Sequence, residues 1–529
     1  MRCLLVNPFY PISETPSPPL GLAFVAAALE RAGVEVRILD LVVTPYSPAR
    51  LRSLMEEFEP DIVGSTSVTM NVVKAAEVIR DAKRIDPEIL TVMGGPHVTF
   101  SARETLEELP ELDVVVLGEG EECVVEIAEA WKERRDLARV AGITFRGPDG
   151  IVAEGLKRRP IDVDTLPLPA RHLVPLGRYR ALSLPLTMTT SRGCPHTCIF
   201  CVGRKMVGPK VRYRDPIKVV DEMEYLTGLG FRQINVADDL FTAKESHCLA
   251  VCDEILRRGL QVKWTSFSRV DTVSRRMLDR MREAGCYMIA FGVESGNPEI
   301  LKTIQKRITP EQVIEAVKFC NEAGITPAAS FILGLPGETP ETMRQTIEFG
   351  ETLKAMGTSH GFHLLAPFPG TAVREESERF GIKILTDDWS QYHANRAIVE
   401  TPSVTKEDLE GAVAAWDKEL VEWLGYIREQ YEKGEATEEE AWPILNLDRT
   451  VALYDLMVGG AIEEKGSWPT EGRPVSEDEA LRGLAERVDG ATRYPKDQIL
   501  AALRYAAERD NLVCVRENGH IRWQWVDDL

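Results

Sequence analysis

Residues 191–201 read Ser-Arg-Gly-Cys-Pro-His-Thr-Cys-Ile-Phe-Cys and directly follow a strand candidate, Leu186–Thr190. The segment places Cys194, Cys198 and Cys201 within eight residues. A loop at a strand end that holds three cysteines at these spacings can direct all three thiols into one concave site. The sequence therefore predicts that the three cysteines hold a soft metal centre.

An iron–sulfur cluster and a structural zinc ion are the two candidates for this centre. A zinc site would need a fourth protein ligand, for which His196 is a candidate, and zinc cysteines usually come as two widely separated pairs. The sequence offers no second pair of that kind. A four-iron cube held by three thiolates leaves one iron open to bind a substrate or a cofactor. We favour the cluster over zinc, and both over a disulfide or inert core thiols.

Strand and helix patterns alternate around the cysteine loop, over residues 184–375. Six short strand candidates, each followed by a helical segment, are Leu186–Thr190, Gln233–Val236, Lys263–Phe267, Met288–Val293, Ala328–Leu333 and Gly361–Leu365. This alternation predicts a partial (β/α)6 barrel of the TIM type. Its chemistry would lie at the carboxyl ends of the strands.

The spacing Cys194-x3-Cys198-x2-Cys201 resembles the signature of the radical S-adenosylmethionine (SAM) enzymes, and Phe200 before the last thiol also matches that family. The resemblance implies a [4Fe-4S] cluster whose open iron binds SAM, and reductive cleavage of SAM to a 5′-deoxyadenosyl radical. It also implies an external electron donor of the flavodoxin or ferredoxin type.

Further segments of the barrel resemble SAM-contacting segments of the same family. Phe291–Gly296 is similar to the segment whose carboxylate and hydroxyl reach the SAM ribose, which implies roles for Glu294 and Ser295. The segment Phe331–Glu338 resembles the adenine-contacting strand and turn, which implies a contact through Leu333. Arg269 stands where a basic residue could meet the SAM carboxylate.

The segment after the second barrel strand departs from the family pattern. The family often carries Gly-Gly-Glu there to hold the SAM amino group, whereas this chain has Asp238 and Asp239. We expect one of the two carboxylates to replace that glutamate. Capping of the next helix is the alternative role for each.

Residues 1–140 show a second alternation of strands and helices, which predicts a doubly wound, Rossmann-like α/β domain with a parallel sheet. Ligands bind such sheets beyond the carboxyl ends of the strands, where glycine lets the backbone approach them closely. The candidate residues in the turns of this domain are Pro19, Leu20, Gly21, Ser65, Thr66, Ser67, Gly94, Gly95, His97, Gly118, Glu119 and Gly120.

The order of these turns resembles the cobalamin-binding domain that precedes the barrel in one subgroup of radical SAM enzymes. The chain looks most like the group of the phosphinate P-methylases and the anaerobic magnesium-protoporphyrin ester cyclase. The cobalamin fingerprint Asp-x-His-x-x-Gly is absent from residues 1–140, where His97 is the only histidine, so the lower axial ligand of cobalt stays open.

The resemblance implies radical methyl transfer to an unactivated carbon or phosphorus centre of a small molecule. The alternatives are a radical cyclase or rearrangement enzyme that uses cobalamin without methyl transfer, and a non-catalytic cobalamin-binding regulator. No residue type in the sequence fixes the substrate or the oligomeric state.

Composition and the remaining segments complete the expected organisation. Residues 141–183 are predicted to form a proline-containing linker, 376–470 a helical C-terminal extension, and 471–529 a small winged-helix-like module. The chain carries 63 Lys and Arg against 83 Asp and Glu, a net charge of −20 that disfavours nucleic acid as a partner. The apolar stretch Leu22–Leu29 is too short to cross a membrane, and we expect a cytoplasmic protein.

Overall fold

The computed structural model describes residues 1–11, 16–147, 150, 152–156, 158–231, 233–470, 475–517 and 519–529. Its first domain is a parallel sheet in the order β2-β1-β3-β4-β5, extended by β6 and β7. The strands are β1 (Arg2–Asn7), β2 (Glu35–Asp40), β3 (Ile62–Thr66), β4 (Leu90–Gly94), β5 (Val114–Val116), β6 (Ile143–Arg146) and β7 (Val152–Glu154). The helices are α1 (Leu20–Arg31), α2 (Pro48–Phe58), α3 (Val72–Ile85), α4 (Pro96–Phe100), α5 (Ala102–Glu108) and α6 (Glu121–Lys132).

The central strand β1 explains why this sheet is doubly wound. Its residues Cys3–Val6 are buried on both faces, as expected for a parallel strand with helices on either side. In the order 2-1-3-4-5, the strand order reverses between β1 and β3, whereas all five strands run parallel. Ligands bind such sheets at the carboxyl ends of the strands beside this switch point. The predicted α/β architecture of residues 1–140 is confirmed.

The segment expected as a linker, 141–183, differs from that expectation. Strand β6 pairs antiparallel with β5, and β7 pairs with β6, so Ile143–Arg146 and Val152–Glu154 belong to the first sheet. Helix α7 (Leu176–Ala181) is also packed in place: the buried Tyr179 hydroxyl donates to Asp40 Oδ2 at 2.7 Å. The proline content predicted irregular backbone here. Instead, apolar residues such as Ile143 and Phe145 are buried in a strand that pairs with the edge of the sheet.

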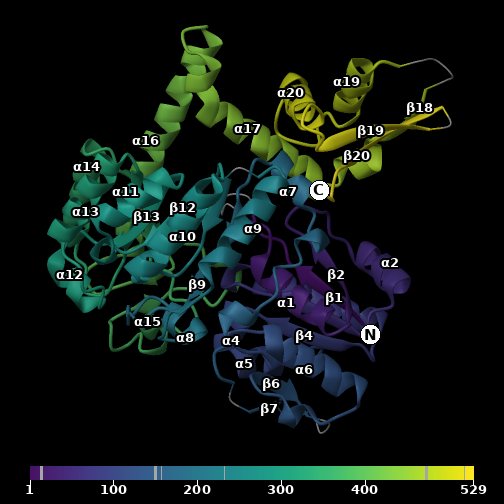
Figure 1. Cartoon of the computed structure of the whole chain (residues 1–529), viewed down its shortest axis with the longest axis horizontal. Coiled ribbons are helices and arrows are strands. Elements are labelled where there is room, and N and C mark those ends of the chain that lie inside the picture. The colour runs from purple at the N-terminus through teal and green to yellow at the C-terminus, as the bar shows by residue number, and fades with distance from the viewer. Residues whose placement is uncertain are drawn as a thin grey trace.

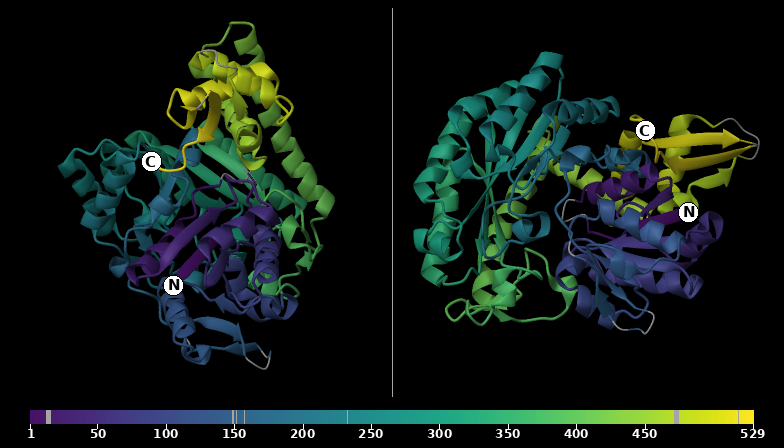
Figure 2. Two further views of the ribbon diagram at one scale, coloured as in Figure 1. Left: turned by 90° about the vertical axis from the view of Figure 1, so that its right-hand side faces the viewer. Right: turned by 60° about the horizontal axis from the view of Figure 1, so that its bottom comes forward.

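The second domain is the predicted six-stranded partial barrel, with parallel strands in the order β15-β14-β13-β12-β11-β8. The strands are β8 (Leu186–Met188), β11 (Gln233–Val236), β12 (Lys263–Ser268), β13 (Cys286–Glu294), β14 (Thr326–Leu333) and β15 (Ser359–Leu364). The helices are α8 (Gly203–Val207), α9 (Pro216–Gly228), α10 (Glu245–Arg258), α11 (Arg275–Glu283), α12 (Pro298–Thr303), α13 (Pro310–Ala323), α14 (Pro340–Ala355) and α15 (Ala372–Glu375). The barrel (teal) lies beside the first domain (purple and blue) in Figure 1 and in the right view of Figure 2.

A two-stranded ribbon encloses the cysteine loop. Strand β9 (Ser191–Arg192) ends just before the first cysteine, and β10 (Arg212–Tyr213) returns antiparallel to it, with Arg192 opposite Arg212. The ribbon therefore fixes both ends of the segment that carries the three thiols.

The C-terminal part begins as a helical extension and ends in a small module. Its elements are β16 (Lys383–Ile384), β17 (Val399–Glu400), α16 (Lys406–Glu432), α17 (Glu438–Val458), α18 (Ala461–Lys465), β18 (Ser467–Pro469), α19 (Glu477–Arg487), α20 (Lys496–Ala507), β19 (Leu512–Glu517) and β20 (His520–Trp525). Helices α16 and α17 form a hairpin whose tip projects from the body, and α17 runs back to pack against it (Figure 1). Strand β18 pairs with β20, so the module includes residues before the expected boundary at 471. Among the described residues, no helix is long and apolar enough to span a membrane.

Candidate functional site

The cysteine loop is anchored to the barrel through its backbone and through one side chain. The Ile199 N–H donates to the Ile304 carbonyl at 3.2 Å, and the Val373 N–H donates to the Ile199 carbonyl at 3.1 Å. The Thr197 hydroxyl donates to Gln305 Oε1 at 2.8 Å. Two segments distant in sequence thus hold the loop at the carboxyl ends of the barrel strands.

The donor set fits an iron–sulfur cluster. Cys194 and Cys198 are half-buried and Cys201 is exposed, and the Gly203 N–H donates to Cys201 Sγ at 3.3 Å. Backbone N–H groups of this kind stabilise a thiolate. In the part of the chain that the structure describes, no three His, Cys, Asp or Glu side chains converge closely enough to hold a single metal ion. Three thiols on one loop are the ligand set of an iron–sulfur cluster that leaves one iron open.

A buried ion pair lies beside this loop. Lys306 Nζ is 2.6 Å from Glu294 Oε1, and each side chain is only 8% exposed. A Cβ atom on Gly292 would lie 2.4 Å from that Glu294 oxygen, so the pair occupies space that glycine leaves free. Glu294 itself has φ +71°, a strained value for a residue with a side chain, of the kind that concentrates at functional sites.

Arg269 holds the segment that carries Lys306. Its Nη2 donates to the Lys306 carbonyl at 2.6 Å, while its Nε and Nη2 pair with the Asp271 carboxylate at 2.9 and 3.0 Å. The guanidinium is therefore engaged within the protein. Lys306 is not among the residues expected from the sequence. It lies between Gln305 and Arg307, which both have positive φ, and this unusual turn is seen only in the backbone of the structure.

The two adjacent aspartates occupy different environments. Asp238 is 2% exposed, and its Oδ2 accepts from the hydroxyls of Thr190 and Ser191 at 2.6 and 2.7 Å. Burial raises the pKa of Asp238, and these hydrogen bonds oppose the rise. Asp239 is exposed and its Oδ2 accepts from the Gly193 N–H at 3.1 Å, so it lies against the cysteine loop. Of the two, only Asp239 presents a carboxylate at the surface of this site.

The other expected SAM residues are placed as follows. Phe200 is half-buried and packs against the barrel core, and Leu333 is buried at the end of β14. The Ser295 hydroxyl is fully buried and hydrogen-bonds Thr346 Oγ1 at 3.1 Å, away from solvent. Glu338, four residues past Gly334, accepts from the Gly334 N–H at 2.6 Å and shapes that turn, and burial raises its pKa to about 7.

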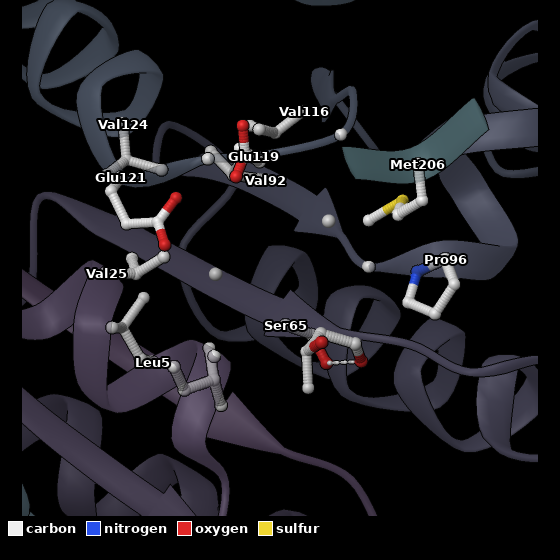
Figure 3. A pocket seen from close by; sticks show the side chains of 18 of the residues that line it. Leu5, Val25, Ser65, Val92, Pro96, Val116, Glu119, Glu121, Val124 and Met206 are labelled. Atoms are coloured by element: carbon white, nitrogen blue, oxygen red, sulfur yellow. Dashed lines mark hydrogen bonds between the residues drawn. The ribbon is translucent and has the colours of Figure 1, made fainter. Parts of the chain in front are cut away.

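A pocket of about 270 Å³ opens at the carboxyl ends of the first sheet (Figure 3). Eight of the expected cobalamin residues line it: Gly21, Ser65, Thr66, Gly94, Gly95, Gly118, Glu119 and Gly120. Glycine at these positions keeps the walls open. A Cβ on Gly95, which has φ +103°, would lie 2.4 Å from the Ser67 carbonyl oxygen, and one on Gly120 would lie 3.1 Å from Val116 Cγ1.

Four expected residues do not line this pocket. Pro19 and Leu20 are half-buried at the start of α1, and the fully buried Ser67 hydrogen-bonds the Gly94 carbonyl. The imidazole of His97 packs edge-on against the indole of Trp389, with 4.8 Å between ring centroids, and burial lowers its pKa to about 4. The sequence could not show this, because the indole belongs to the C-terminal extension. In the described residues, no histidine lines the pocket.

Other pocket residues were missed by the sequence analysis. The apolar wall is formed by Leu5, Leu22, Val25, Val92, Val116 and Val124. Alternation in the strands predicted that such side chains are buried, but not that they face a cavity. Arg192, Met206 and Val207 also line it, from the ribbon strand β9 and from helix α8 just after the cysteines. The pocket and the cysteine loop are therefore neighbours.

Ion pairs join the two domains at the rim of the pocket. The Glu119 carboxylate is 7% exposed and lies 2.8 Å from Arg212 Nη1 and 3.2 Å from Arg192 Nη1. Glu121 lies 2.7 Å from the same Arg192 nitrogen. Glu119 is expected from the sequence to bind the ligand, and in the structure its oxygens accept from Arg192 and Arg212 of the ribbon and from the Ile161 N–H.

Comparison with known proteins identifies both domains. Residues 13–128 match the B12 binding domain family, and residues 188–350 match the radical SAM superfamily. The fold resembles the solved structure of the cobalamin-dependent S-adenosylmethionine radical enzyme OxsB with aqua-cobalamin bound, with a TM-score of 0.69 at 18% identity. The match covers 96% of this chain and 80% of the OxsB chain. That likeness concerns the fold.

Two curated relatives extend over most of the same region. An uncharacterized methyltransferase of Pyrococcus horikoshii is 33% identical over 416 residues, which cover 77% of this chain and 90% of the relative. The anaerobic magnesium-protoporphyrin IX monomethyl ester cyclase of Cereibacter sphaeroides is 31% identical over 427 residues, which cover 77% of this chain and 68% of the cyclase. Three thiols on one barrel loop, a glycine-walled pocket beside them and these matches together show that the chain belongs to the cobalamin-dependent radical SAM enzymes.

Proposed function

We propose that this enzyme transfers a methyl group to an unactivated carbon or phosphorus centre of a small molecule, with SAM cleaved reductively in the barrel. The observation that carries the proposal is the shared wall of the two sites, because Arg192, Met206 and Val207 flank the cysteines and also line the pocket. When bound, the [4Fe-4S] cluster supplies an electron to SAM and cobalamin supplies a methyl group.

The residues of the barrel site have separate roles in this proposal. Cys194, Cys198 and Cys201 hold the cluster. Asp239 is the candidate for the SAM amino group, because its carboxylate is exposed beside the cysteine loop. Glu294 is the candidate for the ribose, and Lys306 orients its carboxylate through the buried ion pair. Arg269 acts as a positioning residue, since it is held by Asp271 and the Lys306 carbonyl.

The first domain binds and shields the corrinoid. The pocket is smaller than a whole corrinoid, so we expect it to enclose one part of the ligand while the rest lies at its mouth, toward the barrel. The apolar wall excludes water from the enclosed part, which protects reactive species from side reactions.

Two further properties belong to the proposal. Enzymes of this superfamily act with an external reductant, and we propose a flavodoxin- or ferredoxin-type donor for this one. We also propose a cytoplasmic location, in keeping with the seven cysteines outside the cysteine loop, none of which forms a disulfide within the described residues.

A radical cyclase or rearrangement enzyme is the second candidate, favoured by the cyclase from Cereibacter sphaeroides among the relatives. Anaerobic incubation of the reduced, cofactor-loaded enzyme with methyl-labelled SAM and a pool of candidate small molecules separates the two. We expect 5′-deoxyadenosine together with label in a new product. A new product without label would replace the methyltransferase by the cyclase, and the absence of 5′-deoxyadenosine with every candidate would contradict both.

A further inference from the structure

Glu121 is a buried carboxylate inside the otherwise apolar part of the pocket. It is the first residue of helix α6 and is 4% exposed. Figure 3 shows its carboxylate directed into the pocket, close to Val25. Val25 and Val124 line the same region, so the carboxylate stands among methyl groups rather than water.

Only one oxygen of this carboxylate has a partner. Glu121 Oε1 lies 2.7 Å from Arg192 Nη1. Glu121 Oε2 has no hydrogen-bond partner among the residues that the structure describes. A buried oxygen without a donor is costly, and such groups in native proteins usually have a function or a missing partner.

The chemistry of the site selects the kind of group that would approach this oxygen. A carboxylate accepts hydrogen bonds, so the missing partner is an N–H or O–H donor. An anionic ligand group would be repelled at Glu121 Oε2, because Arg192 pairs with the other oxygen of this carboxylate. Cobalamin offers both kinds of neutral donor, in the primary amides around its ring and in the ribose hydroxyl of its nucleotide tail.

We propose that Glu121 is a ligand-binding residue of the cobalamin pocket, whose Oε2 accepts a hydrogen bond from an amide N–H or a hydroxyl of the corrinoid. Arg192 fixes the carboxylate through the other oxygen and is held in turn by Glu119 at 3.2 Å and by the Phe24 ring, 5.0 Å from the guanidinium carbon. Because Arg192 stands two residues before Cys194, the ribbon of the cysteine loop becomes part of the corrinoid site. The inference rests on the proposed function of this pocket.

Equilibrium binding of hydroxocobalamin to the full chain tests the role of Glu121. Glu121→Gln keeps the size of the side chain, but its amide can satisfy either Arg192 or the ligand donor and not both. We expect the Kd for hydroxocobalamin to rise at least about tenfold, as befits a lost hydrogen bond to a charged group. Glu121→Asp shortens the side chain by one methylene group and moves the carboxylate away from the ligand, so it should also weaken binding. This variant replaces Glu121→Gln in the test if the Gln variant does not fold.

Glu122→Gln is the matched control. Glu122 is the next residue of α6, and its carboxylate lies 2.9 Å from Arg158 Nη1 and is 51% exposed, outside the pocket. We expect this variant to bind hydroxocobalamin like the wild type. Iron content and thermal unfolding of all variants show whether the fold is kept.

Cobinamide, which lacks the nucleotide tail, locates the donor. An equal loss of affinity for both corrinoids would support a ring amide as the donor, and a loss restricted to hydroxocobalamin would support the tail hydroxyl. An unchanged Kd in both Glu121 variants would overturn the inference while leaving the proposed function in place. If the wild type bound neither corrinoid, the proposed function of the pocket would fail instead.

Discussion

Arg212 donates hydrogen bonds to both carboxylate oxygens of Glu119, from Nη1 to Oε2 at 2.8 Å and from Nη2 to Oε1 at 3.0 Å. The arginine belongs to the ribbon strand that follows the cysteine loop, and the glutamate follows the last parallel strand of the first domain. A bidentate pair of this kind fixes orientation as well as distance. The contact therefore fixes the strand after the cysteine loop against the turn that lines the glycine-walled pocket.

Removal of this contact should loosen the two domains. In Arg212→Met, Glu119 loses its bidentate partner and keeps Arg192 and the Ile161 N–H, both at 3.2 Å. We expect a loss of stability of about 3 kcal/mol, the lower end for a broken buried pair. Thermal unfolding measures the loss. Lys218→Met removes the exposed pair with Asp164 and is the control, with an expected change below about 1 kcal/mol. Equal shifts in both variants would contradict the assigned role.

The second prediction concerns the cluster ligands. Cys198→Ala should abolish the iron and sulfide content of anaerobically purified protein, because two thiolates cannot replace three on the same loop. Cys514→Ala removes a half-buried thiol from strand β19 and should retain the cluster. A cluster of wild-type content in Cys198→Ala would contradict the entire assignment of the loop.

The third prediction concerns the Glu294 and Lys306 pair. Lys306→Met leaves a buried carboxylate uncompensated, and Glu294→Gln leaves a buried ammonium, so each should cost about 3–5 kcal/mol. The double variant should lose less than the sum, which a double-mutant cycle of thermal unfolding detects. If the pair positions Glu294 for SAM, Lys306→Arg should partly restore the affinity for SAM that Lys306→Met loses. Purely additive losses would show that the two residues do not interact.

The fourth prediction compares two glycines of the pocket in protein without cobalamin. Gly95→Ala should destabilise the fold by about 2–3 kcal/mol, since its methyl group would overlap the Ser67 carbonyl and its φ is +103°. Gly21→Ala meets no atom within 4 Å and lies in helix α1, so we expect a gain of about 0.5–1 kcal/mol. Chemical denaturation monitored in the first domain measures both changes.

The fifth prediction is a pH dependence from His97. Burial lowers its pKa in the folded protein to about 4, below the value of about 6.5 expected when unfolded, so the unfolded chain binds the extra proton first. The neutral His97 side chain therefore makes its full contribution to stability above about pH 6.5, and this contribution is lost as the pH falls toward 4. The loss of stability reaches about 2 kcal/mol at pH 5. The unfolding temperature of the wild type should fall more between pH 7 and pH 5 than that of His97→Gln. Parallel slopes would contradict the assignment.

The amino-acid sequence by itself determined the features that depend on local spacing. The positions of Cys194, Cys198 and Cys201 fall on one loop whatever the rest of the chain does, and the period of apolar residues fixes which segments become strands and helices. From these followed the partial barrel, the doubly wound first domain and the turns that line the pocket, because parallel strands must present their carboxyl ends at one edge.

Only the tertiary structure decided which polar side chains face each site. Arg212 and Glu119 are 93 residues apart, and the ring contact of His97 reaches Trp389 from a different part of the chain. Such partners are chosen by packing between domains, which leaves no periodic trace in either segment. For the same reason the sequence assigned no role to Lys306, and it placed Glu121 in the Gly118–Glu121 turn without showing that its carboxylate is buried. A buried charge differs from a surface charge only in what surrounds it.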